Sequence, residues 1–233
     1  MAADPALLLL FDIDGTLLRR ATREHAAAVR SAITEVHRIP EPYDGGFEPA
    51  GRTDGEIARL ILLGHDVDAK TIDDRAHDVQ IAACETFART CPPDLSHTVI
   101  AGVTDVLAAL AGRADMRLAL VTGNFEPIAR VKLRAAGIGH HFEPRQGGFG
   151  SDSEERAELP ELARVRAGRR GEPHPRERTV VIGDTPRDIA CARADGVHVL
   201  AVATGPYGAE ELSGADGIAA TTADLLPLLA ALV

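Results

Sequence analysis

The length, composition and charge of the chain exclude several classes of protein before any motif is considered. The 233 residues include 25 Lys and Arg against 35 Asp and Glu, which makes the formal net charge −10. Nucleic acids and anionic membrane surfaces call for a basic face, so this balance argues against both as partners. The hydrophobic fraction of 45% and the length favour one globular core, or a core with a small second domain.

The cysteines and the first residues of the chain indicate where the protein works. Cys84, Cys91 and Cys191 are odd in number and widely spread, so they match neither a zinc site nor a disulfide framework. The first residues lack the basic region and the long apolar core of a signal peptide, and no apolar run is as long as a membrane span. We therefore expect a cytoplasmic protein.

Five short apolar runs predict buried strands. In chain order they are "LLLLF" (7–11), "RLALV" (117–121), "TVVIG" (179–183), "HVLAV" (198–202) and "GIAA" (217–220). Nearly continuous apolar runs are typical of strands that are covered on both faces. Patterns with helical spacing separate the later strands, and the glycine-rich stretch "GGFG" (147–150) is interpreted as a flexible loop. This alternation predicts an α/β protein with a doubly wound parallel sheet.

The first predicted strand is followed by a long interval without strands. Apolar residues recur there at helical spacing, as in Val29, Ile33 and Val36. Stretches rich in Pro and Gly, at 38–46 and 91–95, predict joints between helices. The sequence therefore predicts an all-helical insert over 19–96 within an α/β core formed by 1–18 and 97–233.

Acidic and hydroxyl residues come directly after three of the predicted strands, in "FDIDGT" (11–16), "VTGN" (121–124) and "GDTPRD" (183–188). In an open parallel sheet, ligands bind outside the carboxyl ends of the strands. The side chains expected to converge there are Asp12, Asp14, Thr122, Asp184 and Asp188. Four carboxylates in one place need a cation, and oxygen ligands with a high negative charge select a hard ion such as Mg²⁺. The sequence thus predicts a Mg²⁺ site.

These three motifs resemble those of a known family in type, order and spacing. "DIDGT" resembles the first motif of the haloacid dehalogenase superfamily of phosphatases, "VTGN" the second and "GDTPRD" the fourth. The predicted helical insert resembles the small helical cap of that family. The resemblance covers the whole predicted core. It implies Mg²⁺-dependent hydrolysis of a small phosphorylated metabolite, as in phosphoglycolate phosphatases, through an aspartyl-phosphate intermediate.

The resemblance also implies a role for each motif residue. Asp12 would be the nucleophile, and Asp14 would be the general acid on the leaving oxygen and then the base for the hydrolytic water. The phosphate would be bound by Gly15, Thr122, Gly123 and Asn124. The metal ligands would be Asp12, Asp14, Asp184 and Asp188. For Asp188, at a first helical turn, stabilisation of the helix N-terminus is the alternative.

The third family motif, which supplies a Lys or Arg beside the nucleophile, departs from its common form. A lysine followed by proline is usual, whereas the matching stretch is "GGFGSDSEERAELPELA" (147–163). Arg156 falls in the matching register, and its planar guanidinium suits phosphate. Lys132 is the other candidate, although its stem would also serve simply to cover apolar surface. Both are predicted to be catalytic, with Arg156 preferred.

Arg52 is a candidate for substrate specificity. "GRTDGEI" (51–57) resembles a cap loop with which relatives contact substrate, so Arg52 would bind a second anionic group of a phosphoglycolate-like or sugar-phosphate substrate. The alternative is an ordinary helix N-terminus capped by Thr53 or Asp54.

Other activities of the family stay open. A phosphosugar mutase would use the same nucleophile, and a phosphonate-cleaving enzyme would need a cap lysine, for which Lys70 is the one choice. A non-catalytic phosphate-binding or regulatory protein is a third alternative, against which the complete motif set argues. Dehalogenation is disfavoured because Asp14 supplies an acid that a departing halide does not need.

Overall fold

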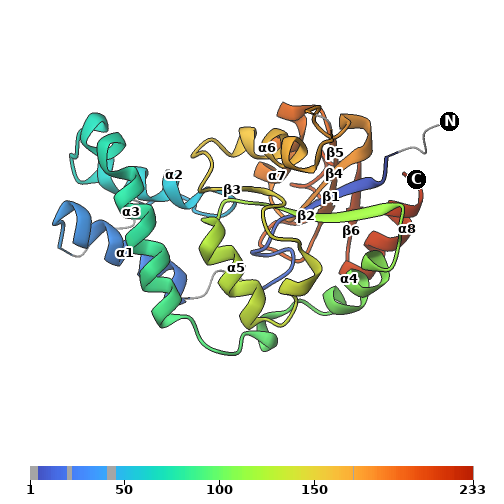
Figure 1. Ribbon diagram of the computed structural model, residues 1–233, viewed down its shortest axis with the longest axis horizontal. Coiled ribbons are helices and arrows are strands. Elements are labelled where there is room, and N and C mark those ends of the chain that lie inside the picture. Colours follow the sequence, from blue (N-terminus) through green and yellow to red (C-terminus); the bar gives the residue numbers. More distant parts are fainter. Residues whose placement is uncertain (1–4, 20–22, 41–45, 170, 233) are drawn as a thin grey trace.

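The computed structural model describes residues 5–19, 23–40, 46–169 and 171–232, and it shows an α/β core with a helical cap (Figure 1). One sheet has the strand order β3-β2-β1-β4-β5-β6, and each neighbouring pair runs parallel. The strands are β1 (Leu7–Phe11), β2 (Met116–Thr122), β3 (Gly148–Phe149), β4 (Thr179–Gly183), β5 (His198–Val202) and β6 (Gly217–Ala219). The predicted fold class is confirmed. The interpretation of 147–150 as a flexible loop is wrong, because two of its residues pair with the end of β2.

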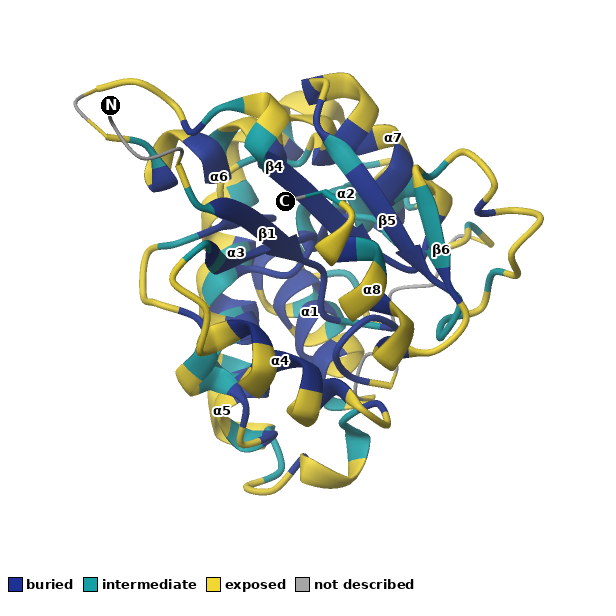
Figure 2. Ribbon diagram, turned by 90° about the vertical axis from the view of Figure 1, so that its right-hand side faces the viewer, coloured by how far each residue is buried: buried dark blue, intermediate teal, exposed yellow. Residues whose placement is uncertain are grey.

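The central strand β1 is buried along its whole length. Its alternate side chains enter two cores: Leu7 and Leu9 pack on one face of the sheet, and Leu8 and Leu10 on the other. Figure 2 shows β1, β4 and β5 buried between exposed helix surfaces. Burial on both faces explains why the strands are continuously apolar in sequence.

Helices cover both faces of the sheet. On one face lie α4 (Val103–Ala111), α5 (Glu126–Ala135) and α8 (Leu225–Ala230), and on the other lie α6 (Leu159–Ala167) and α7 (Pro186–Asp195). Proline occupies the first turn of α7, where its missing N–H costs nothing, and Thr185 caps the helix. This helix start holds one of the predicted site residues.

A three-helix body, here called the cap, lies beside the core and consists of α1 (Arg23–His37), α2 (Asp54–Gly64) and α3 (Ala69–Thr90). Its buried side chains form a hydrophobic cluster that also includes Phe125 and Ile128 of the core. The cap helices fall within the predicted insert, and the residue boundaries of the two domains stay a prediction. Among the helices of the described residues, none combines the length and apolar character needed to cross a bilayer.

Candidate active site

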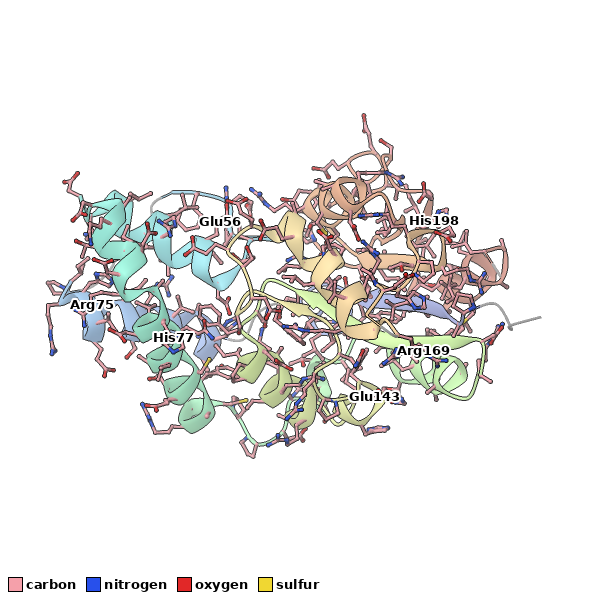
Figure 3. All side chains as sticks on the ribbon, turned by 45° about the horizontal axis from the view of Figure 1, so that its top comes forward. Glu56, Arg75, His77, Glu143, Arg169 and His198 are labelled. Carbon is pink, nitrogen blue, oxygen red and sulfur yellow. The ribbon has the colours of Figure 1, made fainter. Side chains whose placement is uncertain are left out.

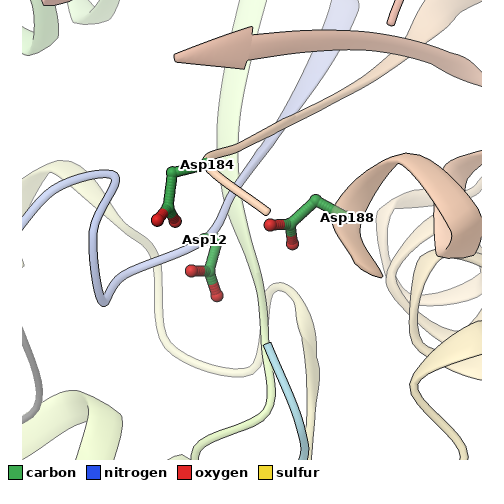
Figure 4. Close-up of side chains that lie close together, drawn as sticks. All are labelled: Asp12, Asp184 and Asp188. Atoms are coloured by element: carbon green, nitrogen blue, oxygen red, sulfur yellow. The ribbon is translucent and has the colours of Figure 1, made fainter. Parts of the chain in front are cut away.

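Three carboxylates meet at the carboxyl ends of the strands. Asp12 follows β1, Asp184 follows β4, and Asp188 lies in the first turn of α7. Their carboxylate oxygens lie within 4.8 Å of one another, and all three residues are buried. Figure 4 shows the three side chains pointing toward one another. The parallel sheet therefore brings together residues that are far apart in the sequence.

The charges of this cluster are not balanced by the protein alone. Burial raises the pKa of Asp12 to about 7; Arg156 opposes this rise, and Asp188 and Asp14 add to it. Burial, together with the charges of Asp12 and Asp188, raises the pKa of Asp184 to about 8. Carboxylates that resist ionisation in this way are typical of a site that a cation completes.

One oxygen of Asp184 supports a metal site independently. Its Oδ2 is buried and has no hydrogen-bond partner among the described residues, whereas Oδ1 accepts a bond from the hydroxyl of Thr16 at 3.2 Å. Gly15 and Gly205 leave room around Oδ2: a Cβ atom would lie 2.1 Å from it at Gly15 and 1.7 Å from it at Gly205. An unpaired anionic oxygen in an all-oxygen donor set fits Mg²⁺.

Asp188 serves two neighbours at once. Its Oδ2 accepts hydrogen bonds from the backbone N–H of Thr185 at 3.0 Å and from the Thr185 hydroxyl at 2.8 Å, which closes a capping box. Its Oδ1 accepts a hydrogen bond from Arg156. The helix N-terminus interpretation is thus correct for one oxygen, and the other faces the cluster.

Arg156 lies beside the predicted nucleophile. It begins the short 3-10 helix η3 (Arg156–Glu158), its side chain is buried, and its Nη2 donates to Asp12 Oδ1 at 3.1 Å as well as to Asp188. Its charge is therefore shared between two carboxylates.

Asp14 lies apart from the three-carboxylate cluster. Its carboxylate accepts hydrogen bonds from Lys132 Nζ at 2.7 and 2.9 Å and from Asn124 Nδ2 at 2.9 Å. Burial opposes its ionisation, but the charges of Lys132 and His25 and these hydrogen bonds outweigh burial and lower its pKa. The environments of Asp12 and Asp14 thus differ, as the roles of nucleophile and acid require. Without a cation, however, Asp12 has the higher pKa and retains its proton more readily than Asp14 does.

The second-motif residues link this site to the cap. Thr122 Oγ1 accepts a hydrogen bond from Asn124 Nδ2 at 3.1 Å, so the two polar side chains lie side by side. Gly123 is covered by the cap: its carbonyl accepts the N–H of Asp54 at 2.8 Å, and a Cβ atom on Gly123 would lie 2.1 Å from the carbonyl oxygen of Arg52. Only glycine fits at this contact.

The Arg52 side chain is engaged within the cap. Its Nε donates to the carbonyl of Glu48 at 2.9 Å, its guanidinium pairs with Glu56, and it lies 5.7 Å from the ring centre of Phe47. Thr53 caps α2, as the helix N-terminus interpretation expected. A substrate contact by Arg52 stays a prediction.

Comparison with known proteins identifies the family of this chain. A family model described as "haloacid dehalogenase-like hydrolase" matches residues 9–193, which is most of the chain. The protein belongs to this family. The resemblance predicted from the three motifs is confirmed, and with it the expectation of a hydrolase.

Curated relatives of this haloacid dehalogenase-like hydrolase carry two kinds of name. "Tyrosine-protein kinase PtkA" of Mycobacterium tuberculosis is 30% identical over 201 residues, which are 86% of this chain and 63% of the relative. The chain thus spans less than two thirds of that relative's length. "Phosphoglycolate phosphatase" of Nitrosospira multiformis is 28% identical over 207 residues, 89% of this chain and 86% of the relative.

Solved structures agree in fold. A predicted phosphatase from Clostridium acetobutylicum has a TM-score of 0.67 at 16% identity, and the match covers 97% of this chain and 99% of that one. CbbY from Rhodobacter sphaeroides, in complex with phosphate, has a TM-score of 0.59 at 22% identity, covering 94% and 96% of the two chains.

Sequence reasoning missed two residues of this hydrolase that lie where the cap meets the core. His25 Nε2 lies 3.0 Å from Asp54 Oδ2, and the same oxygen accepts the N–H of Phe125 at 2.8 Å. His25 and His37 both lie in α1 without the spacing of metal ligands, and the sequence pattern indicates only a helix cap for Asp54. Nothing in the sequence pattern places His25 next to Asp54, because they belong to different helices.

Proposed function

We propose that the protein is a Mg²⁺-dependent phosphatase that hydrolyses a small phosphomonoester. The observation that carries the proposal is the group of three buried carboxylates around the unpaired oxygen of Asp184, with Arg156 beside Asp12. The relatives named phosphoglycolate phosphatase support this activity. Mg²⁺ held by Asp12, Asp184 and Asp188 would neutralise these carboxylates and the phosphate, so that an anionic nucleophile and an anionic substrate can meet.

In the proposed reaction, Asp12 attacks phosphorus and the bond to the leaving oxygen breaks. One carboxylate oxygen of Asp12 is then bonded to phosphorus, which makes an aspartyl-phosphate. Arg156, 3.1 Å from Asp12 Oδ1, orients the nucleophile and offers its remaining N–H groups to phosphate oxygens. Thr122 and the backbone N–H groups of Gly123 and Asn124, at the same edge of the sheet, would bind the other phosphate oxygens.

Asp14 carries the proton in both half-reactions. Its lowered pKa makes it an anion in the substrate-free protein. A phosphate dianion that binds nearby raises this pKa by like-charge repulsion, so the proton that Asp14 gives to the leaving oxygen is taken up with the substrate. After the alcohol departs, water attacks phosphorus and the bond between phosphorus and Asp12 breaks, which releases phosphate and restores the Asp12 carboxylate. The carboxylate of Asp14 accepts the proton of this water, and Lys132 and Asn124 hold Asp14 in place.

The docked cap favours a small substrate. Backbone contacts between Arg52–Asp54 and Gly123 cover the second-motif loop, and the carboxylates of Asp12, Asp184 and Asp188 are buried. The relatives named tyrosine-protein kinase suggest phosphoryl transfer to a protein tyrosine as a second candidate. A tyrosine on a folded partner would require the cap to be displaced, so we prefer the metabolite.

The test is phosphate release from a panel of small phosphomonoesters, including phosphoglycolate and sugar phosphates, with Mg²⁺ or with a chelator. We expect turnover with Mg²⁺ and a loss of at least about a thousandfold in Asp12→Asn, because the nucleophile is removed. Its thermal unfolding must show that the variant is folded. Absence of release from every ester by the wild-type protein would contradict the proposal, and a parallel incubation with ATP and a tyrosine peptide tests the kinase candidate.

A further inference from the structure

One loop of the core connects three parts of the site. The bridging loop, residues 150–155, begins after β3 and ends at Arg156. At its start, the N–H of Gly150 donates to the carbonyls of Thr122 and Asn124, each at 3.0 Å. Directly after its end, Arg156 donates to Asp12 and Asp188. The loop therefore joins the second-motif residues to the cation beside the nucleophile.

The cap holds the same loop at Glu154. The hydroxyl of Thr53 donates to the Glu154 carbonyl at 2.8 Å. Arg59 of α2 pairs with the Glu154 carboxylate through Nε and, at 3.1 Å, through Nη2, and this Nη2 also donates to Asp73 of α3 at 2.6 Å. Gly55 permits the approach, because a Cβ atom there would lie 2.8 Å from Glu154 Cγ.

These contacts come from α2, while α3 packs against α5 of the core at another place. In Figure 3, Glu56 on α2 lies on the core side of the cap, whereas Arg75 on α3 lies at the far end. Backbone contacts of Asp54 with Gly123 and Phe125 dock the start of α2 on the second-motif loop. The cap thus touches both ends of the polar network through one short segment.

The Arg59–Glu154 pair positions the loop more than it stabilises the fold. The side chains of Arg59 and Glu154 are 27% and 28% exposed, and ion pairs that retain contact with water add little to the free energy of unfolding. Only one residue separates Glu154 from Arg156, so a displaced Glu154 moves the guanidinium relative to Asp12. Misplacement of a catalytic group by about 1 Å can reduce a rate by about a hundredfold.

We propose that Glu154 and Arg59 are positioning residues, which couple docking of the cap to the placement of Arg156 against Asp12. When Thr53 and Arg59 hold Glu154, Arg156 is fixed beside the nucleophile; when the cap is not docked, this restraint is lost. Through this coupling, the site is complete only when the cap is docked. The expected effect on turnover rests on the proposed function, whereas the expected effect on the position of Arg156 does not.

The experiment compares Glu154→Gln and Arg59→Gln with Asp74→Asn. Asp74 is on α3, next to Asp73, and pairs with Lys70 of the same helix at 2.5 Å, so this control removes a cap charge without touching the loop. We expect a kcat about tenfold lower in the first two variants, with KM changed less than about threefold, because the chemical step is affected more than binding. Arg59→Lys, which keeps the charge, should recover part of the lost kcat.

Hydrogen exchange separates this proposal from the proposed function. In Glu154→Gln and Arg59→Gln, amide exchange should become faster at 51–56 and also at Arg156–Glu158, while Asp74→Asn should exchange like the wild-type protein. Unchanged exchange at Arg156–Glu158, or an unchanged kcat, would overturn the coupling. If the wild-type protein releases no phosphate from any ester, the proposed function fails, and the exchange at Arg156–Glu158 still decides the coupling.

Discussion

Lys132 is fully buried, yet its ammonium group makes an ion pair. It donates to both oxygens of Asp14 and to Asn124 Oδ1 at 2.8 Å, so its hydrogen bonds replace those of water. A buried charge that loses its partner destabilises the folded state more than the pair stabilised it. The energetic role of Lys132 is therefore tied to Asp14.

We predict that Lys132→Met lowers the free energy of unfolding by about 3 kcal/mol, because it leaves the half-buried Asp14 carboxylate without its cation. Denaturant unfolding measures this change. The double variant Asp14→Asn with Lys132→Met is the control: it removes both charges and should regain more than half of the loss. Equal stability of Lys132→Met and the wild-type protein would contradict this account of the pair.

At the scale of elements, the cap and the core meet through backbone contacts as well as through the apolar side chains of Phe125 and Ile128. The segment Arg52–Asp54, at the start of α2, lies against Gly123 and Phe125 at the end of β2 and the start of α5. Close approach of two backbones requires that one of them carries no side chain there. This makes Gly123 a residue of cap docking as well as a candidate for phosphate binding.

We predict that Gly123→Ala reduces turnover about a hundredfold, because its Cβ would meet the backbone of Arg52 at 2.1 Å and the cap would have to shift. Phosphate release and thermal unfolding are measured together, and the loss of activity should exceed any loss of stability. Gly64→Ala is the matched control. Gly64 is the last residue of α2 and has no atom near its Cβ position, so the substitution should not destabilise the protein and should leave turnover unchanged. Full activity in Gly123→Ala would show that the cap contact is dispensable.

At the scale of the whole molecule, the carboxylate cluster links stability to pH and to the metal. The pKa values of Asp12 and Asp184 are raised to about 7 and about 8 in the folded protein, while each is near 3.8 in an ordinary environment. Between these limits the folded protein binds more protons than the unfolded chain. These two carboxylates therefore give the metal-free protein a stability that is lost as the pH rises from about 4 to about 8.

We predict that the unfolding temperature measured in a chelator falls between pH 5 and pH 8, and that Mg²⁺ raises it more at pH 8 than at pH 5, because the metal binds the ionised carboxylates. Asp184→Asn should flatten the metal-free profile and weaken the response to Mg²⁺. A profile that is independent of pH in the chelator, or a Mg²⁺ effect of equal size at both values, would contradict a metal site at these residues.

The sequence by itself predicted the sheet apart from β3, and it predicted the meeting of Asp12, Asp184 and Asp188. Each long strand is apolar on both faces, and "FDIDGT", "VTGN" and "GDTPRD" follow three of these strands. In a parallel sheet the carboxyl ends of the strands lie at one edge, so the position of these motifs along the chain already predicts that their side chains meet. The local sequence pattern is enough to predict which side chains meet, because the geometry of a parallel sheet is regular.

Only the tertiary structure decided how the charges are paired. Arg156 lies 144 residues from Asp12, and Lys132 lies 118 residues from Asp14, and no periodicity relates either pair. The strand β3 escaped prediction because its two residues include a glycine and lack a strand pattern. The contacts of the cap with Gly123 and Glu154 depend on how two separately packed bodies dock, and that orientation is fixed by contacts between distant segments rather than by local sequence preference.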